Sequence, residues 1–138
     1  MTEIACVVAL EACLGEGPFW HHLRGEIFWF DILGKTLHAA KPDGSTAGKW
    51  VFDKMASAAG IIDATHLAIA AEKEIFRLDL ATGKTATLVP LDADIPGNRS
   101  NDGRVNRAGG LWIGTMAHDE VPYSGSVYQF RNGSLKKL

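Results

Sequence analysis

The chain has 138 residues, of which 46% are hydrophobic and 22% are charged, and its formal net charge is −2. This length suits one hydrophobic core, and no stretch concentrates Lys or Arg in the way that nucleic-acid-binding proteins do. The composition therefore favours a protein that acts on a small molecule and argues against nucleic acid as a partner.

The N-terminal residues, Met1 to Cys6, include an early acidic residue and lack both a basic region and a long apolar run. They predict neither a signal peptide nor a membrane span. Cys6 and Cys13 are the two cysteines of the chain, too few for a disulfide framework and suited to a reducing compartment. We therefore expect a cytoplasmic protein without a membrane partner, in which both cysteines are small buried thiols.

Short apolar runs bounded by turn residues predict three pairs of strands, over residues 26–31 and 36–40, 66–71 and 74–80, and 110–116 and 126–130. Each pair leads into a turn with an x-Gly dipeptide and then into another extended run, over residues 49–52, 85–89 and 135–138. The turn residues Asp43, Thr82 and Asn132 are 39 and 50 positions apart, and an insert over residues 118–125 lengthens the second interval. A repeat of this length built from hairpins is typical of β-propeller blades.

We therefore predict an all-β protein with about three propeller blades, each a small antiparallel sheet of three or four strands. Three blades do not close a ring, because propellers usually use about four to eight. An open stack would leave two apolar sheet faces exposed. The sequence thus predicts either part of a protein about twice as long or two copies that close a ring together.

Glu16 is the first candidate site residue, because it stands between Gly15 and Gly17 and just before Pro18, Phe19 and Trp20. A carboxylate fixed in such apolar surroundings needs a cation or hydrogen-bond donors. One interpretation is a turn carboxylate that caps nearby backbone N–H groups. The other is a ligand for a hard metal ion, which prefers carboxylate and amide oxygens.

Arg99 and Asn101 form the second candidate, within the run Asn98 to Gly103. In an extended segment they would point to the same side, where a guanidinium and an amide suit a polyhydroxylated ligand. The alternative is an Asx-rich turn that leads into the following strand. His118 and Asp119 lie in the insert after that strand, where they are either solvated loop groups or part of a site.

Three segments carry a resemblance to a known family: Leu14 to Trp20, Ser57 to Gly60, and Arg99 to Gly103 together with Gly114 to Met116. They resemble the family of gluconolactonases, regucalcin (senescence marker protein) and luciferin-regenerating enzyme, and the resemblance covers almost the whole chain. It implies a six-bladed β-propeller that binds one divalent metal ion in its central channel and hydrolyses sugar lactones. Residues 1–138 would then be the N-terminal half of a single propeller domain.

By position in the family's motifs, the resemblance implies that Glu16 is a metal ligand and that Arg99, Asn101 and Asp119 contact the substrate. The remaining ligands and the general base would lie beyond residue 138. Oxygen ligands admit Ca²⁺, Mg²⁺, Mn²⁺ and Zn²⁺. Another class of function stays open, namely a non-catalytic calcium- or ligand-binding propeller, or a half-propeller that serves as an interaction module.

Overall fold

A computed structural model of the protein describes residues 4–138; Met1, Thr2 and Glu3, which the leader prediction included, lie outside this range. The strands in chain order are β1 (Gly15–His21), β2 (Glu26–Asp31), β3 (Thr36–Ala40), β4 (Thr46–Val51), β5 (Ala56–Ile61), β6 (His66–Ala71), β7 (Glu74–Asp79), β8 (Thr85–Pro90), β9 (Asn98–Val105), β10 (Leu111–Ala117), β11 (Val127–Arg131) and β12 (Ser134–Lys137).

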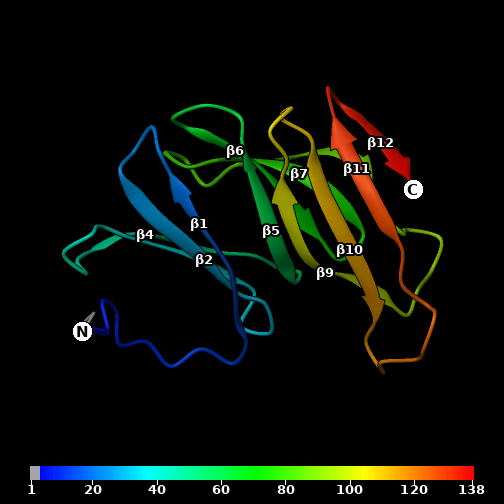
Figure 1. Cartoon of the computed structure of the whole chain (residues 1–138), viewed down its shortest axis with the longest axis horizontal. Helices are drawn as coiled ribbons and strands as arrows, with labels where there is room; N and C mark the ends of the chain where they lie inside the picture. Colours follow the sequence, from blue (N-terminus) through cyan, green and yellow to red (C-terminus); the bar gives the residue numbers. More distant parts are fainter. Residues whose placement is uncertain (1–3) are drawn as a thin grey trace.

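The strands form three antiparallel sheets of four, each a meander in chain order (Figure 1). We call them blade 1 (β1–β4), blade 2 (β5–β8) and blade 3 (β9–β12). The first strands of the blades, β1, β5 and β9, contact one another across the blade boundaries, which makes them the inner strands. The prediction of an all-β fold with three propeller blades is confirmed.

The predicted turns fall between the third and fourth strands of the blades. In the last of them, Asn132 and Gly133 both have positive φ, at 51° and 76°. Two consecutive residues with positive φ define the turn whose twist matches the flanking strands of a hairpin. This conformation explains why the sequence has an Asn-Gly dipeptide here.

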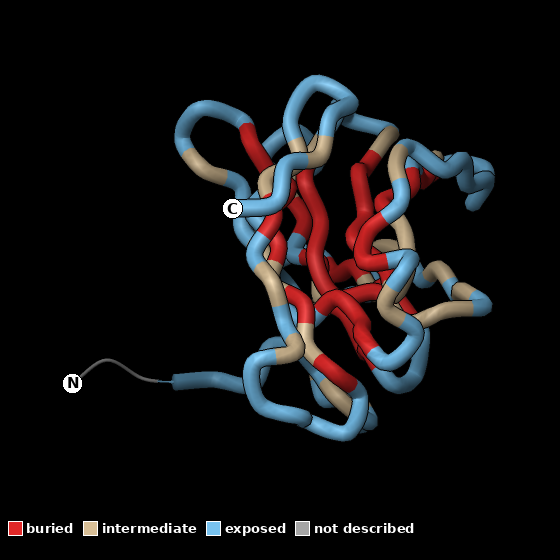
Figure 2. The backbone as a smooth tube through the Cα atoms, turned by 90° about the vertical axis from the view of Figure 1, so that its right-hand side faces the viewer, coloured by how far each residue is buried: buried red, intermediate tan, exposed pale blue. Residues whose placement is uncertain are grey.

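Burial differs between the middle blade and the outer two. In β6 of blade 2, all residues from Leu67 to Ala71 are buried, because sheets cover both of its faces. In β2 and β10 of the outer blades, buried and more exposed residues alternate, as expected for strands with one covered face. Figure 2 shows the buried backbone concentrated in the middle of the molecule. Blades 1 and 3 therefore each present one open face.

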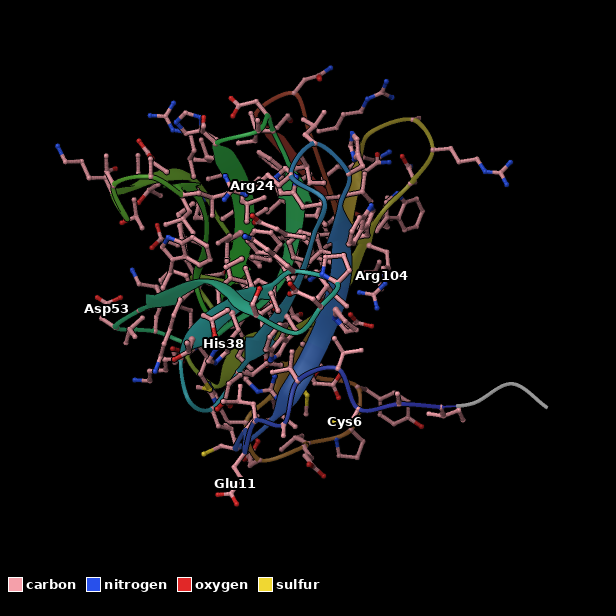
Figure 3. The ribbon with its side chains drawn as sticks, turned by 90° about the vertical axis from the view of Figure 1, so that its left-hand side faces the viewer. Cys6, Glu11, Arg24, His38, Asp53 and Arg104 are labelled. Carbon is pink, nitrogen blue, oxygen red and sulfur yellow. The ribbon has the colours of Figure 1, made fainter. Side chains whose placement is uncertain are left out.

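The expectation of buried thiols was wrong, because Cys6 and Cys13 are both exposed. They belong to the segment before β1, which lies along the surface of blade 1, and Figure 3 shows Cys6 at that surface. Residues 4–138 also contain no helix long and apolar enough to cross a lipid bilayer.

Candidate active site

Each inner strand carries a β-bulge near its beginning. In β1 the register shifts between Glu16 and Phe19, in β5 Ser57 is the extra residue, and in β9 Asn101 is the extra residue. A bulge bends the strand and changes the direction of its side chains, and bulges are common beside active sites. The three bulges lie at the same end of the blades, which we call the site end.

The inner strands pack closely at the site end. Gly17 has a φ of 60°, and a Cβ at this position would overlap the backbone oxygen of Ser57. The buried Oγ of Ser57 donates to Oγ of Ser100 over 2.8 Å, and Ser100 donates to the backbone oxygen of Ala70 over 3.2 Å. These contacts join β1, β5 and β9, so that the neighbours of Glu16 and Arg99 lie at one end of the molecule.

Arg99 is a buried cation, with 8% of its surface exposed. Its Nη1 donates to the backbone oxygen of Ser100 over 3.0 Å and to Oδ1 of Asn101 over 3.3 Å. Among residues 4–138, no carboxylate lies within 4.0 Å of the guanidinium. A buried charge without an opposite charge is costly, and an electron-rich ligand would offset this cost. Arg99 thus contacts the exposed Asn101, which is the extra residue of the bulge in β9.

Glu16 is exposed and lies on the open side of blade 1. With Pro18, Trp20 and Trp29 it lines a groove of about 590 Å³ between blade 1 and the N-terminal segment. Within residues 4–138, no group of three or more His, Cys, Asp or Glu side chains could hold a metal ion. The oxygens of Glu16 suit a hard cation, but the described part of the chain does not form a complete metal site.

His118 and Asp119 follow β10 at the site end, and both are exposed. The backbone N–H of His118 donates to the oxygen of Gly97 over 2.8 Å, and its Nε2 lies 3.5 Å from Oε1 of Glu72 in blade 2. Because Met116 pairs with Arg99 in the register of β9 and β10, Asp119 lies near the same edge of blade 3. No hydrogen bond or ion pair joins the side chains of Asp119 and Arg99.

A second cavity of about 350 Å³ lies along the inner strands, lined by residues of β1, β5 and β9. Its walls include Phe19, Ile61 and Arg104, and Figure 3 shows Arg104 beside β1. In the same view, Glu11 and Arg24, which flank β1, lie at opposite ends of the molecule. The cavity therefore lies where the three inner strands approach one another.

Sequence reasoning missed a buried polar group around Asn98, the residue that precedes Arg99. Asp92 accepts a hydrogen bond from Nδ2 of Asn98 over 2.9 Å and another from the hydroxyl of Tyr128. Burial opposes ionisation of Asp92, but hydrogen bonds from Asn98, Thr115 and Tyr128 outweigh it and lower the pKa of the carboxyl. Burial and the neighbouring Asp92 raise the pKa of Tyr128 to about 12. No motif in the sequence predicts this group, because its members come from separate segments.

Comparison with known proteins places the chain in a family. The profile of the SMP-30/Gluconolactonase/LRE-like region matches residues 14–138. A candidate sugar lactone lactonase of Rhizobium meliloti (strain 1021) is 33% identical over 125 residues, which cover 91% of this chain and 42% of that protein. A 6-deoxy-6-sulfogluconolactonase of Pseudomonas putida is 30% identical over 114 residues, which cover 82% of this chain and 39% of that protein.

Among solved structures, a calcium-binding protein, regucalcin, from Agrobacterium tumefaciens str. C58 superposes with a TM-score of 0.87 and 38% identity. The match covers 92% of this chain and 43% of that one. The chain thus spans less than half the length of the relatives that it matches. Because the family profile covers nearly all of it, the chain belongs to the SMP-30/gluconolactonase/LRE-like family.

Proposed function

We propose that this chain supplies three blades of a sugar lactonase and is active once further blades complete the ring. The observation that carries the proposal is Arg99, a buried guanidinium without a carboxylate partner among residues 4–138 that is hydrogen-bonded to an exposed amide. The lactonase names of the relatives from Rhizobium meliloti and Pseudomonas putida support the same reaction class. Residues 1–138 would form the N-terminal half of one propeller domain.

In this proposal Arg99 and Asn101 bind the substrate. The guanidinium donates to the carbonyl or ring oxygens of the lactone, and the amide of Asn101 both donates to and accepts from sugar hydroxyls. Asp119, on the loop after β10, accepts hydrogen bonds from further hydroxyls at the same edge. Together these groups hold the ring in one orientation, which lowers the entropy cost of reaching the transition state.

Glu16 is proposed as one oxygen ligand of a divalent cation, with the other ligands and the general base outside residues 1–138. The calcium-binding protein from Agrobacterium tumefaciens supports a divalent ion, without fixing its identity for this chain. Such a cation, when bound, polarises the carbonyl of an ester. Ca²⁺, Mg²⁺, Mn²⁺ and Zn²⁺ all accept oxygen ligands and are the ions to test.

The experiment is hydrolysis of glucono-1,5-lactone by the complete protein, with each of these four ions in turn. We expect Arg99→Ala to lower kcat/KM roughly 10- to 100-fold, the range expected for losing hydrogen bonds from a charged group. Arg107→Ala is the matched control, because Arg107 is an exposed arginine in the turn at the far end of β9. Equal activity of the Arg99 and Arg107 variants would contradict the proposed substrate contact.

Glu16→Gln tests the metal ligand separately, with Glu11→Gln as its control, since Glu11 is exposed in the segment before β1. The first variant should bind the activating cation more weakly and hydrolyse less lactone at limiting metal. Unchanged metal dependence would contradict the role of Glu16. Tight calcium binding without any hydrolysis would instead favour a non-catalytic calcium-binding propeller, which the similarity to the Agrobacterium protein also supports.

A further inference from the structure

We propose that four residues beneath the site end, Lys73, Asp92, Asn98 and Tyr128, act as a positioning cluster for Arg99 and for the loop that carries Asp119. The four come from blades 2 and 3 and from the connection between them. Their role in holding these segments follows from the contacts alone, and their effect on substrate rests on the proposed function. None of the four is assigned a contact with substrate.

Asn98 is the centre of the cluster. It is the first residue of β9, it is 1% exposed, and it directly precedes Arg99. Its Nδ2 donates to Oδ2 of Asp92 over 2.9 Å and to the backbone oxygen of Ser124 over 2.8 Å. An amide nitrogen has two N–H groups, so both are used. One side chain therefore ties the start of β9 to the loop of residues 118–126.

Asp92 is the acceptor that makes this arrangement rigid. It is 4% exposed, and its two carboxylate oxygens accept from Asn98 and from the hydroxyl of Tyr128 in β11. Hydrogen bonds to a charged acceptor are shorter and stronger than those between neutral groups. If one donor is removed, the buried carboxylate loses a partner that solvent cannot replace. The cluster therefore resists small displacements of β9 relative to β11.

Lys73 closes the cluster from the turn between β6 and β7 of blade 2. Its Nζ donates to the backbone oxygen of Asn98 over 2.6 Å, to that of Asp92 over 3.4 Å, and to that of Ile95. The three acceptors lie in the connection between β8 and β9 and at the first residue of β9. One ammonium group thus binds three carbonyl groups of this stretch. The backbone N–H of Leu91 also donates to the backbone oxygen of Lys73, over 2.9 Å.

The cluster lies on the side of β9 opposite to Arg99. Successive residues of a strand point to opposite faces, so Asn98 points into the cluster when Arg99 points away from it. In the register, Asn98 faces Ala117 and Arg99 faces Met116. A shift of Asn98 therefore tilts the strand at Arg99. The same shift frees Ser124 and with it the loop that contains Asp119.

The test uses two mild variants of the complete protein, Tyr128→Phe and Lys73→Met. Tyr123→Phe and Lys84→Met are the matched controls, because Tyr123 and Lys84 are exposed. The first measurement is amide hydrogen exchange, which needs no substrate. We expect exchange in residues 98–101 and 118–126 to become at least about fivefold faster in the two cluster variants, as the loss of one buried hydrogen bond implies. Exchange in β6 should stay as in the wild type.

The second measurement is the kinetics of lactone hydrolysis with a titration of the activating cation. We expect KM to rise about fivefold, with kcat and cation affinity changed less than about twofold, because the cluster supports substrate contacts and not Glu16. Unchanged exchange in both segments would overturn the positioning role. Faster exchange with an unchanged KM in an active enzyme would overturn its effect on Arg99. If the wild type hydrolyses no lactone, the proposed function fails, and exchange alone decides the positioning role.

Discussion

Among residues 4–138, His21 is the one side chain with buried nitrogen atoms that have no hydrogen-bond partner in the protein. It lies at the end of β1, against the ring of Phe28, with 5.4 Å between the ring centroids. Burial, and then the charge of Arg24, lower the pKa of His21 below its ordinary value of 6.5. The imidazole is therefore held in its neutral form.

This histidine should make the fold sensitive to mild acid. Below a pH of about 6.5 the unfolded chain takes up a proton that the folded chain resists, so stability falls as the pH falls, by at most about 1.4 kcal/mol per pH unit. Above that range both states are neutral, and His21 contributes no pH dependence. The acid loss should be smaller in His21→Leu, which removes both unpaired nitrogen atoms.

Urea unfolding of the complete protein at pH 7.5, 6.5 and 5.5 measures this effect. His22→Gln is the control, because His22 is the adjacent residue and is exposed. Most of the pH dependence should remain in this variant, because the charge of His22 is a smaller cause of the lowered pKa of His21 than burial and Arg24. Parallel pH profiles for the wild type and His21→Leu would show that another group titrates in this range.

At the scale of elements, the fit of β1 against β5 depends on Gly17. Its φ of 60° is a conformation that costs other residues about 1–2 kcal/mol, and an added Cβ would also overlap Ser57. Gly83 has a φ of 71° but nothing within 4 Å of an added Cβ. We expect Gly83→Ala to lower the free energy of unfolding by about 1–2 kcal/mol, and Gly17→Ala by about 1–3 kcal/mol more, because only the second overpacks an interface.

Denaturant titration of both variants checks this difference. The comparison is controlled within the chain, because both glycines have positive φ and differ in their surroundings. Equal losses would mean that β1 moves away from β5 without cost. A larger loss for Gly17→Ala would show that the contact at the site end stabilises the boundary between blades 1 and 2.

The middle strands of the blades were predictable because each is a short apolar run bounded by turn residues. Residues 26–31, 36–40 and 66–71 are strands with the bounds that the apolar runs and turns indicate. The inner strands were not recognisable from pattern alone. β1 and β5 contain Gly-Glu-Gly-Pro and Ala-Ser-Ala-Ala-Gly, since small residues are required where inner strands from several blades converge. Strand propensity favours the opposite residues, β-branched and aromatic.

The candidate site also has a part that local sequence motifs indicate and a part that only the folded structure shows. Glu16, Arg99 and Asn101 could be proposed from the sequence because they lie within short motifs of polar residues and glycines. The positioning cluster was missed because Lys73, Asp92, Asn98 and Tyr128 belong to different strands and connections, and only the pairing of blades 2 and 3 brings them together. The bulges at Ser57 and Asn101 were equally hidden, since a bulge is a property of two paired strands.

At the scale of the whole molecule, the outer faces of blades 1 and 3 leave large apolar side chains exposed. Trp20 is 52% exposed in β1, and Trp112 is 42% exposed in β10. Ile27 and Trp29 lie on the same open face as Trp20 and line the groove beside the N-terminal segment. The equivalent faces of blade 2 are covered. Large apolar side chains arranged on a sheet face favour contact with another sheet.

Truncation of Trp112 measures whether such contact exists in the complete protein. If another blade covers this face, Trp112→Ala should cost about 3–5 kcal/mol, as buried aromatic truncations do. If the face meets solvent, the cost should stay within about 0.5 kcal/mol, as for most surface changes. Val51→Ala is the control, because Val51 lies on the outer strand β4 and is 70% exposed. A small loss for both variants would contradict a closed ring.

The concentration dependence of stability then distinguishes the two ways of closing the ring. If further blades of the same chain cover Trp112, unfolding is unimolecular and its midpoint does not change with protein concentration. If a second copy covers it, association contributes to the free energy of unfolding, and the midpoint rises as the concentration increases. Truncating Trp20 should lower the free energy of unfolding as truncating Trp112 does, because one closed ring buries both open faces. A loss on truncating Trp112 without one on truncating Trp20 would instead indicate a partner that covers blade 3 alone.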